Sequence, residues 1–128
     1  MPSRDRVNAF VATVRDGRYV DAIADFYAPD ASMRENLGPP RVGRDLLIAA
    51  EKAMLGSVSR IATRRAGPVI VDGDRVVIGW EFEVTTLDGG VRRLDELALQ
   101  TWRGDLIVEE QFYYDPAQAA ATVESETA

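Results

Sequence analysis

The sequence contains no cysteine and no histidine, and these two absences exclude several kinds of chemistry. Without cysteine there is no disulfide framework and no thiol nucleophile. Without histidine the chain lacks the commonest metal ligand and the usual acid/base group near neutral pH. We therefore expect no metal site, and any proton transfer has to use Asp, Glu, Tyr or a group tuned by Arg.

Long apolar runs are also absent, since none approaches the roughly 20 residues that span a bilayer. The first six residues are charged and lack the apolar core of a signal peptide. The net charge of −6 argues against nonspecific binding to nucleic acid or to anionic membranes. These features predict a cytoplasmic protein with no nucleic-acid partner and no membrane partner.

Several functional motifs are missing as well. The sequence has no phosphate-binding loop, no dinucleotide fingerprint, no nucleophile elbow and no metal-ligand spacing. Gly89-Gly90 belongs to a hairpin turn. Because the motifs that bind phosphate groups, dinucleotides and metals are missing, we predict no cofactor.

The first half of the chain has helical periodicity. Apolar residues recur at i, i+3, i+4 and i+7 after Ser3, which is a suitable N-cap. A second helix is expected at residues 19–27, and Pro29 prevents it from continuing further. A short strand at 31–37 and a third helix at 44–55 follow.

The second half has the two-residue period of strands. Extended segments are expected at 58–71, 75–87, 91–102 and 106–114, the first of them bulged at Gly67-Pro68. Asp72-Gly73 and Asp88-Gly89-Gly90 are typical of hairpin turns. We predict one domain over residues 1–116 and a frayed tail over 117–128.

A meander of four long strands accumulates twist and curves strongly. Three amphipathic helices precede it and need a surface to cover. The predicted fold class is therefore α+β: a cone-shaped curved antiparallel sheet wrapped around three N-terminal helices, as in a cystatin-like α+β roll. The open end of the cone is the expected pocket for a small apolar molecule.

Three segments resemble one known family. Residues 27–33 read YAPDASM, residues 38–45 read GPPRVGRD, and residues 102–116 read WRGDLIVEEQFYYDP. They are similar to the nuclear transport factor 2-like superfamily, and in particular to its SnoaL-like (polyketide cyclase / ketosteroid isomerase-like) branch, from about residue 4 to residue 116. The superfold hosts isomerases, cyclases, dehydratases, epoxide hydrolases and noncatalytic proteins. The resemblance also implies a homodimer formed through the outer face of the sheet.

Glu35 is the first candidate for catalysis. By resemblance it matches the position of the general base in a ketosteroid isomerase-like member, with Glu in place of the usual Asp. A carboxylate in an apolar pocket has a raised pKa and can move a proton between carbons. The alternative is a glutamate at the pocket rim or surface, paired with Arg34 or Arg41.

Residues 94–102 supply a second set of candidates. One face of this strand carries Glu96, Ala98, Gln100 and Trp102. The resemblance favours this face for the pocket, with Glu96 as a second catalytic residue, whereas periodicity alone leaves either face open. The isomerase's oxyanion donor aligns near Ala98, and its absence there argues against a true ketosteroid isomerase.

The last strand and the helices complete the predicted pocket. By resemblance, the face of the last strand that carries Glu109, Gln111 and Tyr113 lines it. The tyrosines are candidate donors to a ligand oxygen, or structural residues with satisfied hydroxyls. The predicted ligand-binding residues are Tyr19, Tyr27, Met33, Trp80, Phe82, Gln100, Trp102, Gln111 and Tyr113.

The leading functional hypothesis is a cofactor-independent acid/base isomerase or cyclase that acts on an apolar carbonyl compound, with Glu35 as base. The first alternative is a noncatalytic ligand-binding or dimerisation module of the same fold. A further alternative is an enzyme like the limonene-type epoxide hydrolases, which requires an acid–arginine–acid set in the pocket.

Overall fold

The computed structural model describes residues 1–119. The helices are α1 (Arg4–Arg15), α2 (Tyr19–Phe26) and α3 (Arg44–Gly56); the strands are β1 (Tyr27–Glu35), β2 (Arg41–Val42), β3 (Arg60–Asp72), β4 (Arg75–Thr85), β5 (Val91–Arg103) and β6 (Leu106–Tyr113). A short 3₁₀ helix, η1 (Pro116–Ala119), follows β6. The predicted order of helices and strands is confirmed, and the two-residue strand β2 is an addition.

Helix α1 forms where the sequence has both a cap and an apolar stripe. The Ser3 side chain accepts a hydrogen bond of 3.1 Å from the backbone N–H of Arg6, which satisfies one of the free donors at the helix start. The helix buries Val7, Phe10, Val11 and Val14. It ends at Arg15, and Gly17 then adopts φ +79°, a conformation that favours glycine.

The sheet has the strand order β2-β1-β6-β5-β4-β3. Strands β3 to β6 form the predicted antiparallel meander, and β1 adds to β6 in parallel. β1 begins at Tyr27, directly after α2, and is longer than the predicted strand at 31–37 because its pairing with β6 already starts at Tyr27 and Ile107. It ends at Glu35, since Asn36 turns the chain with φ 51°.

The bulge predicted at Gly67-Pro68 is present. The register between β3 and β4 shifts between Ala66 and Val69. Gly79 of β4 packs against this bulge, and a Cβ there would lie 2.9 Å from the carbonyl oxygen of Gly67. The bend therefore depends on a close backbone approach that only glycine allows.

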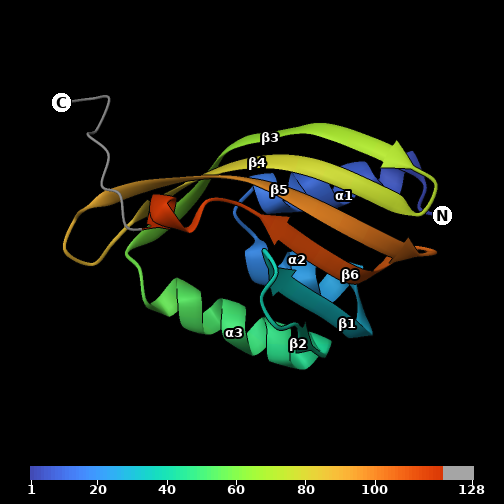
Figure 1. Ribbon diagram of the computed structural model, residues 1–128, viewed down its shortest axis with the longest axis horizontal. Coiled ribbons are helices and arrows are strands. Elements are labelled where there is room, and N and C mark those ends of the chain that lie inside the picture. The colour runs from blue at the N-terminus through green and yellow to red at the C-terminus, as the bar shows by residue number, and fades with distance from the viewer. Residues whose placement is uncertain (120–128) are drawn as a thin grey trace.

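The long strands β3, β4 and β5 arch over α1 and α2, and α3 lies on the side away from β3 (Figure 1). α3 packs mainly against α2 and β1, and of its residues only Leu47 is buried. The helices thus occupy the concave face of an unclosed sheet, as predicted from the sequence.

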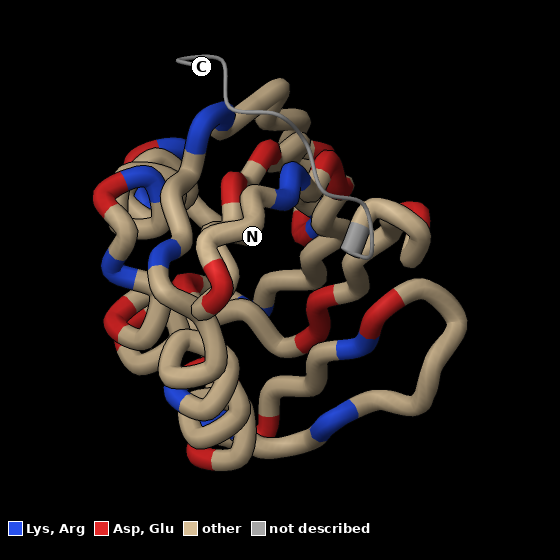
Figure 2. Tube along the Cα trace, turned by 90° about the vertical axis from the view of Figure 1, so that its left-hand side faces the viewer, with Lys and Arg blue, Asp and Glu red and all other residues tan. Residues whose placement is uncertain are grey.

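Charged residues of both signs are interspersed along the chain (Figure 2). On the outer sheet face Glu83 lies opposite Arg93 in the pairing of β4 with β5, as predicted. The guanidinium of Arg64 also donates to Glu83 at 2.8 Å. Glu81 differs from the prediction, because the cations near its carboxylate are Arg64 at 3.9 Å and Arg65 at 3.8 Å, both on β3.

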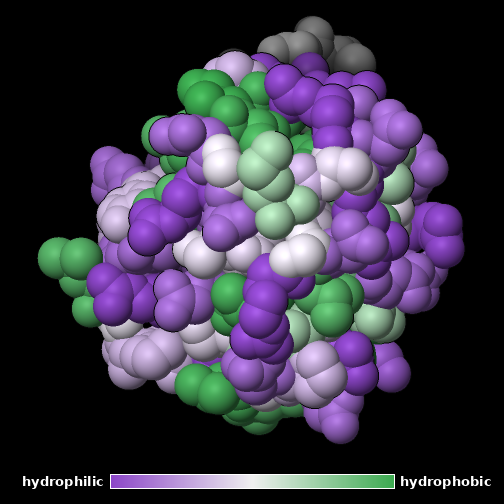
Figure 3. Space-filling model, turned by 90° about the vertical axis from the view of Figure 1, so that its right-hand side faces the viewer, coloured by the Kyte–Doolittle hydropathy of each residue, from purple (hydrophilic) through white to green (hydrophobic). Residues whose placement is uncertain are grey.

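The surface that carries the N-terminus and the turn between β3 and β4 is mostly hydrophilic, with small separate hydrophobic groups (Figure 3). None of the helices within residues 1–119 has the length and apolar composition needed to cross a membrane.

The predicted frayed tail begins with ordered contacts. In η1 the Gln118 side chain accepts a 2.9 Å hydrogen bond from the backbone N–H of Asp95 and donates one of 3.0 Å to the Asp95 carbonyl. The start of the segment is therefore attached to β5 by two hydrogen bonds. Residues 120–128 of the predicted tail lie outside the described part of the chain.

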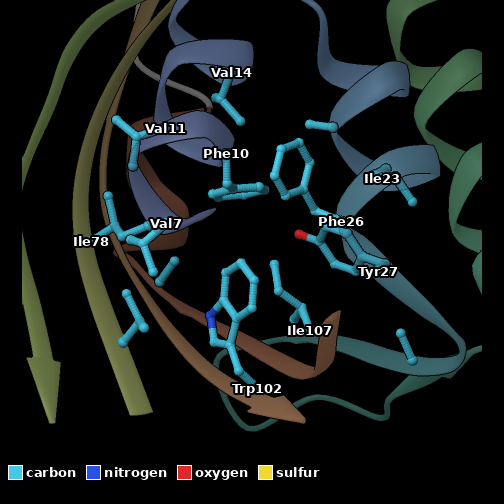
Figure 4. Packing of buried hydrophobic residues seen from close by; sticks show 14 of the residues in the cluster. Val7, Phe10, Val11, Val14, Ile23, Phe26, Tyr27, Ile78, Trp102 and Ile107 are labelled. Carbon is cyan, nitrogen blue, oxygen red and sulfur yellow. The ribbon is translucent and has the colours of Figure 1, made fainter. Parts of the chain in front are cut away.

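A core of buried apolar side chains lies between the helices and the concave face of the sheet (Figure 4). The Phe10 ring lies at its centre, with ring centroids 5.4 Å from Phe26, 6.2 Å from Trp102 and 6.4 Å from Trp80. The tilted and edge-on arrangements of these rings are those that aromatic pairs prefer. Phe10 and Trp80 belong to this core and also line a cavity, so the core and the cavity share part of their residues.

Candidate functional site

A cavity of about 270 Å³ lies between the helices and the concave face of the sheet. Most of its wall is apolar and comes from aromatic and aliphatic side chains of the helices, β1 and the sheet. Of the predicted ligand-binding residues, those in the wall are Tyr19, Tyr27, Met33, Trp80 and Phe82. Their contact with a ligand stays a prediction. The Tyr19 hydroxyl shares a 2.9 Å hydrogen bond with Thr63.

Helix α3 closes one side of the cavity with residues at helical spacing. Leu47, Ala50, Glu51 and Met54 all line it. Burial raises the pKa of Glu51, and the charge of Arg41 partly opposes this. Glu51 was not predicted, although an acid inside an otherwise apolar helical stripe is a pattern that the sequence contains.

Glu96 of β5 lines the cavity directly. Burial raises its pKa to about 8, and the charges of Glu110, Glu35 and Glu51 add to the shift. No hydrogen-bond or ion-pair partner of its side chain is found within residues 1–119. Glu96 is therefore a carboxylic acid that is mostly neutral at pH 7 and free to bond a ligand.

The inward face of β5 is the one favoured by the resemblance. Ala98 and Gln100 are 0% exposed and Trp102 is 2% exposed. Gln100 and Trp102, however, lie below the cavity and are not part of its wall. Their predicted place in the pocket wall is therefore wrong, because inside the protein the Gln100 side chain accepts a hydrogen bond from Trp102 and donates one to Glu110.

Glu110 is the most buried acid that the structure describes, with 3% of the residue exposed. It lines the cavity and accepts a 2.7 Å hydrogen bond from the Gln100 amide and another from the Tyr27 hydroxyl. Burial raises its pKa to about 7, and the two hydrogen bonds oppose that shift. Sequence reasoning had placed Glu110 on the opposite face of its strand.

The face of β6 was predicted wrongly because of a bulge. Thr101 pairs with Glu109 and Trp102 with Ile107, so Val108 is an extra residue on β6. An extra residue reverses the alternation of side chains, so Ile107 and Glu110 both point inward. The sequence contains no feature that predicts this bulge.

Two predicted ligand-binding residues, Gln111 and Tyr113, consequently lie outside the cavity. Gln111 donates a 2.7 Å hydrogen bond to the carbonyl of Asn36. Tyr113 is 42% exposed. Phe112, between them in the sequence, lines the cavity instead.

Glu35 borders the cavity, but its side chain is exposed to solvent. Arg41 is also exposed and borders the cavity, with one guanidinium nitrogen 3.8 Å from the sulfur of Met33. The two residues form the rim. The expectation of a shielded, apolar environment around Glu35 is therefore wrong, and the shielded acids are Glu96, Glu110 and Glu51.

Within residues 1–119, no three acidic residues are grouped so that they could hold a metal ion. The carboxyl groups are distributed around the cavity wall.

Comparison with known proteins identifies the class. The SnoaL-like domain model matches residues 7–110, which is more than half of the chain. The protein therefore belongs to the SnoaL-like domain family, within the nuclear transport factor 2-like superfamily. No curated protein sequence matches the chain.

Solved structures agree with this fold at low sequence identity. TerC co-crystallised with polyporic acid is 22% identical with a TM-score of 0.76, covering 91% of this chain and 93% of TerC. A candidate SnoaL-like polyketide cyclase from Mesorhizobium loti is 23% identical with a TM-score of 0.73, covering 86% of this chain and 97% of that one. A hypothetical protein from Catenulispora acidiphila with a ketosteroid isomerase-like fold, in complex with trimethylamine, is 18% identical with a TM-score of 0.75, covering 91% of this chain and 89% of that one.

Proposed function

We propose that this protein catalyses proton transfer on a small apolar carbonyl compound, such as an isomerisation or a ring closure, with Glu96 as the acid/base residue. The proposal rests on one observation. The Glu96 carboxyl group lines the cavity, has no hydrogen-bond or ion-pair partner among residues 1–119, and has a pKa of about 8. A carboxylate that forms in such surroundings is a stronger base than one in water.

The chemistry fits the remainder of the wall. A proton next to a carbonyl can be removed by one tuned base, provided that a donor stabilises the oxygen on which negative charge develops. Aromatic rings such as Trp80 and Phe82 give the ligand an apolar surface. Because Glu35 is exposed at the rim, we assign the role of base to Glu96 in its place.

The test uses 2-tetralone, a bicyclic ketone with acidic hydrogens next to its carbonyl, and follows hydrogen–deuterium exchange by NMR. The Glu96→Gln variant should lose exchange by about 100-fold or more, the contribution typical of one acid/base group. Binding of the ketone, measured by its NMR line width, should be nearly unchanged because the amide keeps the size of the side chain. Glu109→Gln makes the same change on the outer face and should keep wild-type exchange.

The alternative function is a noncatalytic ligand-binding module. It would be supported if the wild-type protein bound 2-tetralone without accelerating its exchange, and if Glu96→Gln altered only the affinity.

We also propose that the protein forms a homodimer through the outer face of the sheet. Leu97 and Tyr113 lie opposite each other on β5 and β6 and are 49% and 42% exposed. Two apolar side chains at the centre of a sheet face favour association with a second apolar surface.

A further inference from the structure

Four buried side chains form one chain of hydrogen bonds beneath the cavity. The Trp102 indole donates to Gln100 Oε1 at 3.0 Å, Gln100 Nε2 donates to Glu110 Oε2 at 2.7 Å, and Tyr27 and Glu110 Oε1 share the last bond. None of the four side chains is more than 3% exposed. Only Tyr27 and Glu110 reach the cavity wall.

The direction of this chain is set by Trp102. An indole N–H can only donate, so the Gln100 atom that faces it must be the carbonyl oxygen. The amide nitrogen of Gln100 is thereby turned toward Glu110 Oε2. Because Oε2 already faces an N–H donor, a proton on neutral Glu110 has to sit on Oε1, next to Tyr27.

The Tyr27 hydroxyl consequently has two states. When Glu110 is ionised, Tyr27 donates its proton to Oε1. When Glu110 is neutral, the carboxyl group donates to the Tyr27 oxygen, and the hydroxyl proton of Tyr27 has to turn away from Glu110. Figure 4 shows the Tyr27 hydroxyl pointing inward from β1.

We propose that Tyr27 is the proton donor to the oxygen of the bound ligand and that Glu110 holds the proton that replaces it. This inference rests on the proposed function, because it supplies the donor that the carbonyl chemistry needs. The Tyr27 O–H bond breaks as the ligand O–H bond forms, and the proton on Glu110 Oε1 moves to the Tyr27 oxygen. The products are a neutral hydroxyl on the ligand, a restored tyrosine and a carboxylate on Glu110.

Gln100 and Trp102 act as positioning residues in this relay. After the transfer, the Gln100 N–H and the Tyr27 O–H both donate to the new carboxylate, which stabilises its charge. Without the indole donor the side-chain amide of Gln100 could rotate so that its oxygen and nitrogen exchange places. The oxygen of Gln100 would then face Glu110 Oε2.

Other ionisable groups around Glu110 influence when it carries a proton. Those that line the same cavity are Glu51 on α3, Glu96 on β5, Glu35 at the end of β1, and Arg41 on β2. Of the charged neighbours, Glu51 raises the pKa of Glu110, while burial remains the largest cause.

The donor can be tested by binding, without turnover. The probe is 3,4-dinitrophenol, whose phenolate oxygen mimics the charged oxygen of a reacting carbonyl, and the reference is 1,2-dinitrobenzene, which lacks that oxygen. The wild-type protein should bind the phenolate less tightly as pH rises through about 7, because Glu110 loses its proton there. Affinity for the reference compound should change little with pH.

Three variants separate the roles. Tyr27→Phe should weaken phenolate binding by about tenfold or more, a difference of about 1.4 kcal/mol. It should not weaken binding of the reference compound. Glu110→Gln places an amide N–H toward Tyr27 at every pH, so phenolate binding should persist but lose the step near pH 7 that belongs to Glu110. Gln100→Leu should move the midpoint of the pH profile upward, because the hydrogen bond from Gln100 lowers the pKa of Glu110.

Tyr113→Phe is the matched control, since it makes the same change on the outer face. Circular dichroism of each variant checks that it folds. Equal phenolate affinity for Tyr27→Phe and wild type would overturn the inference, as would an unchanged pH profile in a folded Glu110→Gln variant. If the wild-type protein did not accelerate the hydrogen–deuterium exchange of 2-tetralone, only the proposed function would be overturned, because phenolate binding requires no catalysis.

Discussion

The acidic residues of this protein occupy two different environments. On the outer sheet face they are paired with arginines, as Glu83 is with Arg64. Around the cavity, Glu96 and Glu110 have their charged forms disfavoured by burial. Exposed pairs of the first kind contribute little to stability, whereas buried acids of the second kind reduce it when they ionise.

This difference predicts how stability depends on pH. The pKa of Glu96 is raised from 4.5 to about 8 and that of Glu110 from 4.5 to about 7. Between pH 4.5 and about 8 the folded protein therefore binds more protons than the unfolded chain. The free energy of unfolding should fall as pH rises through this window, by a few kcal/mol in total.

Urea unfolding at several pH values measures this slope. Glu110→Gln should flatten the upper part of the profile, since an amide does not ionise. Glu109→Gln, on the outer face, should leave the profile unchanged. A wild-type stability that is constant from about pH 5 to pH 8 would contradict the raised pKa values.

The orientation of some of these acidic residues could be predicted from the sequence, and that of others could not. Glu96 could be predicted from its alternation with Ala98, Gln100 and Trp102, together with the family resemblance. Glu110 could not, because its orientation depends on a bulge in β6. Glu35 was placed correctly at the cavity, but its exposure depends on how the turn after β1 leaves the rim open.

At the scale of the strands, two bulges have different consequences. The bulge in β3 at Gly67-Pro68 bends an edge strand and could be predicted from its glycine and proline. The bulge in β6 at Val108 lies in a segment without glycine or proline, and it turns Glu110 toward the cavity. The first changes the register of an edge strand, and the second decides which β6 side chains line the cavity.

The β3 bulge makes Gly79 a sensitive position. In Gly79→Ala the new methyl group would meet the Gly67 carbonyl oxygen at 2.9 Å and Pro68 Cδ at 3.1 Å. We expect the free energy of unfolding to decrease by about 1–3 kcal/mol, as for other overpacked sites.

Gly56→Ala provides the control for thermal or urea unfolding. A methyl group there meets no atom within 4 Å at the end of α3. This variant should be more stable by about 0.5–1 kcal/mol, because alanine restricts the unfolded chain. Equal stabilities of the two variants would show that the bulge yields to the added methyl group.

For the molecule as a whole, the two faces of the curved sheet differ in what they present. The concave face surrounds the cavity, and the outer face exposes Leu97 and Tyr113. We expect the protein in solution to have the mass of two chains by light scattering, because of the proposed contact through the outer face.

Leu97→Glu should reduce this mass to that of one chain, since it puts like charges into both halves of the contact. Leu37→Glu is the control, because Leu37 is 83% exposed in the turn after β1. It should leave the mass at two chains. A single-chain mass for the wild type at high concentration would rule out the dimer.

The sequence by itself determined the class of this protein: three amphipathic helices, a four-strand meander, and a SnoaL-like cone with an apolar pocket. The helices, strands and turns follow from local periodicity, caps and turn residues, which act over a few neighbours in the chain, and the SnoaL-like assignment follows from the resemblance of three segments. The tertiary structure decided which acids the pocket shields, because burial depends on strands that meet across the sheet. It did so through the register of β6 against β5, where one extra residue turns Glu110 inward and Gln111 and Tyr113 outward.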